Sequence, residues 1–241
     1  MNIIITKSYD ELSKKAANFI ISQVTLKSSS ILGLATGSTP ISTYKYIVKK
    51  FEEDEVNFKD VISFNLDEYI GLGKENDQSY RYFMEENLFS KVNINENNIN
   101  IPNGLADDIE KECVSYEERI KNAGGIDLQL LGLGRNGHIG FNEPNVKFEA
   151  ITHKVELDED TIEANSRFFE SADDVPTEAI SMGIKTIMMS CKVLLLASGK
   201  NKAEAVKALV NGPITPSLPA SILQLHRDVT LILDEEAASL L

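Results

Sequence analysis

Residues 127–144 read Asp-Leu-Gln-Leu-Leu-Gly-Leu-Gly-Arg-Asn-Gly-His-Ile-Gly-Phe-Asn-Glu-Pro. The leucine-rich run over 127–133 is typical of a strand covered on both faces of a parallel sheet. The glycines after it let the backbone turn sharply and approach a ligand; they are Gly132, Gly134, Gly137 and Gly140. An amide, an imidazole and a carboxylate lie among them, on Asn136, His138 and Glu143. Open α/β sheets bind ligands beyond the carboxyl ends of their strands, so this segment predicts an α/β fold with a binding site here.

A hydroxyl-rich turn follows another apolar run, residues 31–40, which read Ile-Leu-Gly-Leu-Ala-Thr-Gly-Ser-Thr-Pro. We expect a buried strand, then the turn Thr36-Gly37-Ser38-Thr39, then a helix with Pro40 near its first turn. Backbone N–H groups, two hydroxyls and the positive helix end would converge there, which suits a phosphate. An ordinary Ser/Thr helix cap is the alternative interpretation.

A third apolar run, residues 61–69, predicts a strand that stops at an acidic pair. It reads Val-Ile-Ser-Phe-Asn-Leu-Asp-Glu-Tyr, and the pair is Asp67 and Glu68. One of these carboxylates could act as a general base, while the other would be structural or solvated. The residues alone leave open which is which.

Strand-like and helical segments alternate along the chain. Apolar runs predict strands at 3–6, 31–35, 61–66, 127–133, 192–197 and 229–233, with shorter ones near 151–156 and 179–183. Helical periodicity occurs at 8–22, 40–52, 79–90, 107–123 and 200–210. Such alternation implies an α/β fold, a doubly wound and mostly parallel sheet sandwiched by helices. No linker divides residues 1–241, which predicts a single domain, and the Asn-rich segment 93–103 is interpreted as an irregular surface connection.

Composition narrows the classes of ligand. The 24 basic and 37 acidic residues give a net charge of −13, which argues against nucleic acid or an anionic membrane as partner. Cys113 and Cys191 form neither a disulfide pattern nor a zinc motif, and we expect no metal site. The glycine-rich segments lack the spacing of a dinucleotide fingerprint. Without a basic leader or a long apolar run, the protein is expected to be cytoplasmic.

Four motifs together resemble the glucosamine-6-phosphate deaminase family. They are Thr36-Gly37-Ser38-Thr39-Pro40, Phe64-Asn65-Leu66-Asp67-Glu68-Tyr69, the segment Gly134 to Pro144, and Asn165-Ser166-Arg167-Phe168-Phe169, in order over nearly the whole chain. The resemblance implies a modified Rossmann-like fold and an enzyme of amino-sugar catabolism. Its reaction would convert glucosamine 6-phosphate and water to fructose 6-phosphate and ammonia. We expect no cofactor, because an internal aldose–ketose shift exchanges no electrons with a carrier.

The same resemblance implies roles for individual residues. Asp67 would be the base that moves a proton between C2 and C1. His138 would open the sugar ring, with Glu143 and Asn136 orienting its imidazole. Some family members carry Asp where this chain has Asn136, so its pH dependence is expected to differ from theirs.

The resemblance also assigns the substrate phosphate. Arg167 and Lys202 would hold it together with the turn 36–39, the arginine through its fork and the lysine as a point charge. Lys200 stays open as a further contact, because it lies only two positions from Lys202. His153 and His226 are given no functional role.

Two other functions remain as alternatives. A 6-phosphogluconolactonase has a similar glycine-rich His loop, but lactone hydrolysis needs no isomerisation base. A sugar-phosphate-sensing domain of a transcription regulator would normally carry a helix-turn-helix, whereas residues 1–35 already predict strand, helix, strand.

The sequence also bears on assembly. Longer family members form hexamers activated by N-acetylglucosamine 6-phosphate, through residues after the His loop and in a C-terminal extension. Here residues 145–152 are short and poor in basic side chains, and the chain ends at Leu241. We expect a monomer or small homo-oligomer without this activation.

Overall fold

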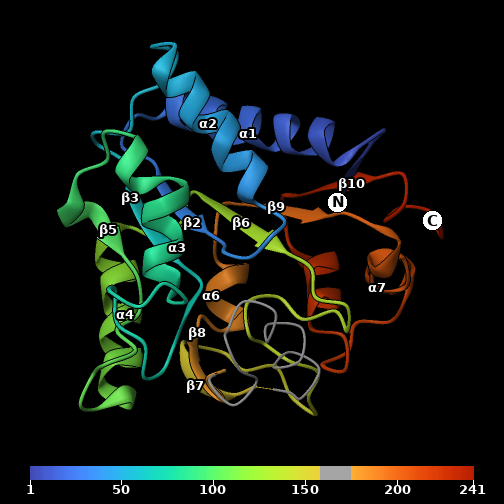
Figure 1. Ribbon diagram of the computed structural model, residues 1–241. Helices are drawn as coiled ribbons and strands as arrows, with labels where there is room; N and C mark the ends of the chain where they lie inside the picture. The colour runs from blue at the N-terminus through green and yellow to red at the C-terminus, as the bar shows by residue number, and fades with distance from the viewer. Residues whose placement is uncertain (158–174) are drawn as a thin grey trace.

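The computed structural model describes residues 1–157 and 175–241 (Figure 1). Within them, seven strands form the main sheet in the order β1-β10-β9-β6-β2-β3-β5, and every neighbouring pair is parallel. Their bounds are β1 (Asn2–Thr6), β2 (Ile31–Leu34), β3 (Ile62–Asn65), β5 (Ile99–Asn100), β6 (Leu128–Gly132), β9 (Lys192–Ala197) and β10 (Val229–Asp234). All six residues of β10 are buried, as the apolar character of its run predicts.

Helices cover both faces of this sheet. In Figure 1, α1 (Tyr9–Leu26) and α2 (Ile41–Glu52) lie together on one side, and α6 (Ile184–Met188) lies on the other. The remaining α-helices of the described residues are α3 (Tyr80–Asn87), α4 (Ile109–Ala123) and α7 (Ala203–Asn211). Short 3-10 turns occupy Phe89–Lys91, Glu96–Asn98, Lys200–Lys202 and Pro219–Leu225. The arrangement is the doubly wound α/β fold that the sequence predicts.

Helix α1 illustrates how the sequence specifies these elements. Ser8 caps it by accepting a hydrogen bond from the backbone N–H of Glu11, and the Glu11 side chain accepts one from the N–H of Lys7. This exchange resembles a capping box and satisfies donors at the helix start. An apolar row then recurs at every fourth residue and is buried: Leu12, Ala16, Ile20 and Val24. The helix therefore packs on the sheet along one stripe.

A second, antiparallel sheet has the order β4-β8-β7 and consists of β4 (Asp67–Tyr69), β8 (Glu178–Ser181) and β7 (His153–Glu156). The strand predicted at 61–66 is confirmed by β3, but the acidic pair does not simply end it. Asp67 and Glu68 begin the second strand β4, because the chain changes sheets at Leu66. The Leu66 N–H donates to the Leu34 carbonyl of the main sheet, and its own carbonyl accepts from the Met182 N–H. Asp67 thus lies at the junction of the two sheets.

The segment 93–103 is more regular than the sequence predicts. It contains a 3-10 turn and the two-residue strand β5, which pairs with β3 at the sheet edge. Two residues are too few to show a hydrophobic period, so the interpretation as an irregular connection is wrong at this point.

Candidate active site

The candidate site lies where the strand order reverses. Successive strands run outward from β2 through β3 to β5, and the chain then returns to the other side of β2 with β6 and β9. Loops at the carboxyl ends of neighbouring strands diverge at such a switch point and leave a crevice for a ligand. Four of the predicted segments follow β2, β3, β6 and β9, so their functional side chains are brought to the same edge of the sheet.

Two buried tyrosines fix the ends of the strands that enter this edge. The Tyr44 hydroxyl of α2 donates to the carbonyl of Ala35, just after β2, at 2.5 Å. The Tyr116 hydroxyl of α4 donates to the carbonyl of Asn65, at the end of β3, at 2.7 Å. Both tyrosine side chains are fully buried. The backbone leading into the loops is therefore held by helices α2 and α4.

Asp67 is a buried carboxylate in an unusual state. Its side chain is 6% exposed, and none of the described residues donates a hydrogen bond to it. Burial, and secondarily the neighbouring charge of Glu68, raise the pKa of Asp67 from 3.8 to about 8. A carboxyl group that titrates near neutral pH in a crevice is a candidate for proton transfer.

Glu68 has a different environment from Asp67. Its carboxylate accepts three backbone hydrogen bonds of 2.9 Å, from the N–H groups of Tyr69, Tyr80 and Arg81. Two of these donors belong to the first turn of α3, so Glu68 satisfies donors that a helix start leaves open. Burial still raises its pKa to about 7, although these hydrogen bonds oppose the shift. The geometry favours a structural role for Glu68.

The loop after β6 brings its three polar side chains together. Nδ1 of His138 lies 3.1 Å from Oε2 of Glu143, and the Asn136 amide donates to the same oxygen at 2.7 Å. Asn136 also accepts from the backbone N–H of His138 at 3.2 Å. Because Nδ1–H donates to the carboxylate, Nε2 is the ring nitrogen that can accept a proton from a ligand.

The same loop packs against Asp67. Gly140 has a positive φ of 58°, and a Cβ at that position would lie 3.6 Å from Oδ2 of Asp67. The following N–H, that of Phe141, donates to Oγ of Ser181 in β8 at 3.0 Å. Ser181 is also the register partner of Asp67. The His138 loop and the Asp67 carboxylate are therefore parts of one site.

The turn 36–39 has the form expected of an anion site. Gly37 has a positive φ of 90°, and α2 begins after Pro40 without any side-chain cap. The alternative reading, an ordinary Ser/Thr cap, is therefore wrong. The turn is held from behind by Tyr9, whose hydroxyl lies 3.1 and 3.0 Å from the carbonyl oxygens of Ser38 and Thr39.

Lys202 closes the turn after β9 and immediately precedes α7. Its side chain is half-buried, whereas Lys200 in the same turn is exposed. Arg167, expected to contact the phosphate, lies outside the described residues together with the rest of its motif. His226, given no functional role, is buried and bonds through Nε2 to the Ser190 carbonyl at 3.0 Å.

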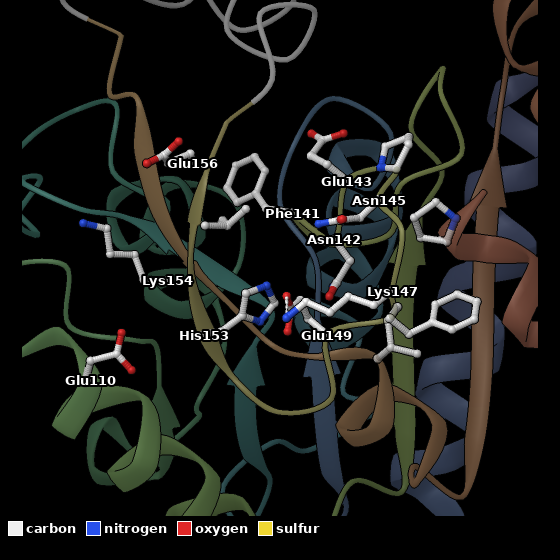
Figure 2. Close-up of a pocket in the computed structure, with 15 residues that line it drawn as sticks. Glu110, Phe141, Asn142, Glu143, Asn145, Lys147, Glu149, His153, Lys154 and Glu156 are labelled. Carbon is white, nitrogen blue, oxygen red and sulfur yellow. Dashed lines mark ion pairs between the residues drawn. The ribbon is translucent and has the colours of Figure 1, made fainter. Parts of the chain in front are cut away.

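A cavity of about 460 Å³ opens beside the His138 loop (Figure 2). Glu143 belongs to its wall, but Asp67 and His138 do not. Among its described lining residues are four glutamates, two lysines and one histidine: Glu110, Glu143, Glu149, Glu156, Lys147, Lys154 and His153. Lys147 pairs with Glu149 at 2.9 Å, and Lys154 pairs with Glu178 at 2.5 Å. Among the described residues of the wall, the glutamates therefore outnumber the lysines.

A metal centre is not indicated in the part of the chain that the structure describes, where no three His, Cys, Asp or Glu side chains are grouped to bind an ion. Nor does any helix of residues 1–157 or 175–241 combine the length and apolar character required to cross a membrane.

Comparison with known proteins identifies the family of the chain. Residues 7–232 match the family model described as glucosamine-6-phosphate isomerases/6-phosphogluconolactonase. The chain therefore belongs to this family. Among its relatives is the glucosamine-6-phosphate deaminase of Clostridium botulinum (strain Langeland / NCTC 10281 / Type F), 62% identical over 99% of this chain and 98% of the relative. The deaminase of Clostridium novyi (strain NT) is 60% identical over 99% of both chains.

Solved structures show the same relationship. One described as a monomeric glucosamine-6-phosphate deaminase is 46% identical, covers 100% of both chains and superposes with a TM-score of 0.98. A 6-phosphogluconolactonase from Trypanosoma cruzi has a TM-score of 0.78 at 20% identity, over 99% of this chain and 96% of the other. At that identity the second comparison shows the fold alone.

Proposed function

We propose that this protein is a glucosamine-6-phosphate deaminase, which converts glucosamine 6-phosphate and water to fructose 6-phosphate and ammonia. One observation carries the proposal: a buried Asp67 carboxylate that titrates near neutral pH lies against a loop holding a His138–Glu143 pair. The reaction needs both a carboxylate base and an imidazole that exchanges protons. Relatives of 60–62% identity that bear this name support the assignment.

Ring opening is the first step. Nε2 of His138 takes the proton of the anomeric hydroxyl and returns a proton to the ring oxygen, which yields the open aldose. Glu143 accepts the Nδ1–H bond throughout, fixing the ring orientation and stabilising the imidazolium as it forms. The Asn136 amide donates a hydrogen bond to the Glu143 carboxylate and so helps to fix its position.

Isomerisation and deamination follow. Asp67 removes the proton from C2 while the aldehyde oxygen takes up a proton, which gives an enolamine. A proton is then delivered to C1 and the nitrogen releases one, which leaves an imine at C2. Water adds to that imine and ammonia leaves, giving the ketose phosphate. A pKa near 8 suits a base that must also give the proton back, because neither protonation state is strongly favoured.

The phosphate end of the substrate is assigned to the turn 36–39 and to Lys202. The open start of α2 offers N–H groups and a partial positive charge, and Lys202 supplies a full charge from the loop after β9. Arg167 is retained as a proposed contact on the resemblance of its motif.

The assembly and location of the enzyme are also proposals. We infer that it acts as a monomer in the cytoplasm, and the monomeric relative that covers the whole chain supports the first part.

The test is a substrate panel with purified protein. Glucosamine 6-phosphate should give ammonia and fructose 6-phosphate in equal amounts, and unphosphorylated glucosamine should react far more slowly. Hydrolysis of 6-phosphogluconolactone without ammonia release would assign the lactonase function instead. Binding of the sugar phosphate without any product would assign a sensor.

A further inference from the structure

Asp234 lies directly behind the turn that carries Lys202. It is the last residue of β10, one position beyond the pairing of Leu233 with Ala197 of β9. Its carboxylate is 6% exposed. Both its oxygens lie 3.0 Å from the backbone N of Gly199, and one of them accepts a short hydrogen bond from the Ser198 hydroxyl. A fourth contact, 2.8 Å from the N–H of Ala237, anchors the carboxylate to the chain that follows β10.

These contacts determine which hydrogen-bond donors of the turn are available to an anion. Gly199 has a φ of 92°, a left-handed conformation in which its N–H points to Asp234 rather than into the crevice. The Ser198 hydroxyl is turned the same way. Two neutral donors of the turn, the Gly199 N–H and the Ser198 hydroxyl, are thus bound to a carboxylate, while the chain continues through the 3-10 turn to the cation of Lys202.

We propose that Asp234 is a positioning residue of the phosphate site, which fixes the turn 198–202 so that Lys202 reaches the substrate phosphate. The inference rests on the proposed function, because it takes Lys202 to bind that phosphate. Charge alone would act in the opposite direction, since a carboxylate near the site repels an anion. The two effects therefore predict opposite changes in KM when the charge of Asp234 is removed. KM rises if Asp234 positions the turn, and it falls if Asp234 only repels the phosphate.

The test compares Asp234→Asn with Asp228→Asn. Asp228 is exposed and precedes the other end of the same strand, so its variant is the matched control. In Asp234→Asn the amide cannot accept from all the donors, the turn loosens, and KM for glucosamine 6-phosphate should rise about tenfold while kcat stays within about twofold. Ser198→Ala removes one donor and should raise KM in the same direction by less. The control should match the wild type.

Inorganic phosphate provides a readout that does not depend on turnover. It should raise the melting temperature of the wild type and of Asp228→Asn, and raise that of Asp234→Asn less. An equal response of all three proteins, including none, would overturn the inference, as would a lower KM in Asp234→Asn. Absence of ammonia release by the wild type would instead contradict the proposed function, and the phosphate titration would still test Asp234.

Discussion

Asp67 combines two properties that usually exclude each other, burial and the need to carry charge. Its raised pKa means that the free enzyme holds a proton there below about pH 8. A base must be deprotonated to act, so kcat/KM should rise with pH through about 8, by up to about tenfold per pH unit on the acid side. A pH profile of kcat/KM checks this. An acid limb near pH 4, the ordinary range of a carboxyl group, would contradict it.

The same shift makes a prediction about stability. Between about pH 4 and pH 8 the folded protein keeps the Asp67 proton that the unfolded chain releases, so the free energy of unfolding falls as pH rises. Asn cannot ionise, and Asp67→Asn should therefore be more stable than the wild type at pH 8, by a few kcal/mol. Urea denaturation across this pH range measures the difference, which should shrink toward pH 4. If the difference in free energy of unfolding between Asp67→Asn and the wild type does not vary with pH, the pKa of Asp67 is not raised.

In the loop after β6, Gly134 leaves room for the imidazole ring of His138. A Cβ on Gly134 would lie 2.5 Å from the His138 ring, while the backbone there does not require a positive φ. Gly134→Ala should therefore keep the fold but displace the imidazole, and kcat should fall by about tenfold or more because misplacement of a catalytic group is costly. Steady-state kinetics together with the melting temperature check this. Unchanged kcat would show that His138 tolerates movement.

The predicted elements differ in how visible they are in the sequence. The apolar runs of β2, β6, β9 and β10 are continuous because both faces of these strands are buried, and the sequence predicts all of them. The sequence also predicts β1, although this edge strand is partly exposed. The division of the run at Leu66 and the existence of β5 depend on partners far along the chain, such as Met182 and β3. Such tertiary pairing leaves no local period.

In the candidate site too, contacts between distant segments could not be predicted from the sequence. Asp67, His138, Glu143 and the turn 36–39 follow strands directly, so their place at one sheet edge could be predicted from sequence. Their catalytic roles stay predictions. Tyr9, Ser181 and Asp234 come from other elements, and nothing in their own segments marks them as partners of these loops. Only the folded chain brings them there.

At the scale of the whole molecule, the cavity in Figure 2 bears on regulation. Lys147 and Lys154 on its wall are paired with glutamates, and among the described lining residues the glutamates outnumber the lysines. Such a surface disfavours a phosphorylated effector. We expect hyperbolic kinetics, unaffected by N-acetylglucosamine 6-phosphate, and a monomer of 26.7 kDa in light scattering. A sigmoidal rate curve that this compound makes hyperbolic, or a hexamer, would contradict the expectation.

The division of labour between Asp67 and Glu68 is the central claim, and ammonia release from glucosamine 6-phosphate tests it most directly. Asp67→Asn keeps the shape of the side chain but removes the proton acceptor, so kcat should fall by about 10²–10⁴-fold with little change in KM. Glu68→Gln retains one acceptor for the start of α3 and should remain active, with a lower melting temperature. A nearly active Asp67→Asn together with an inactive Glu68→Gln would remove Asp67 from the mechanism.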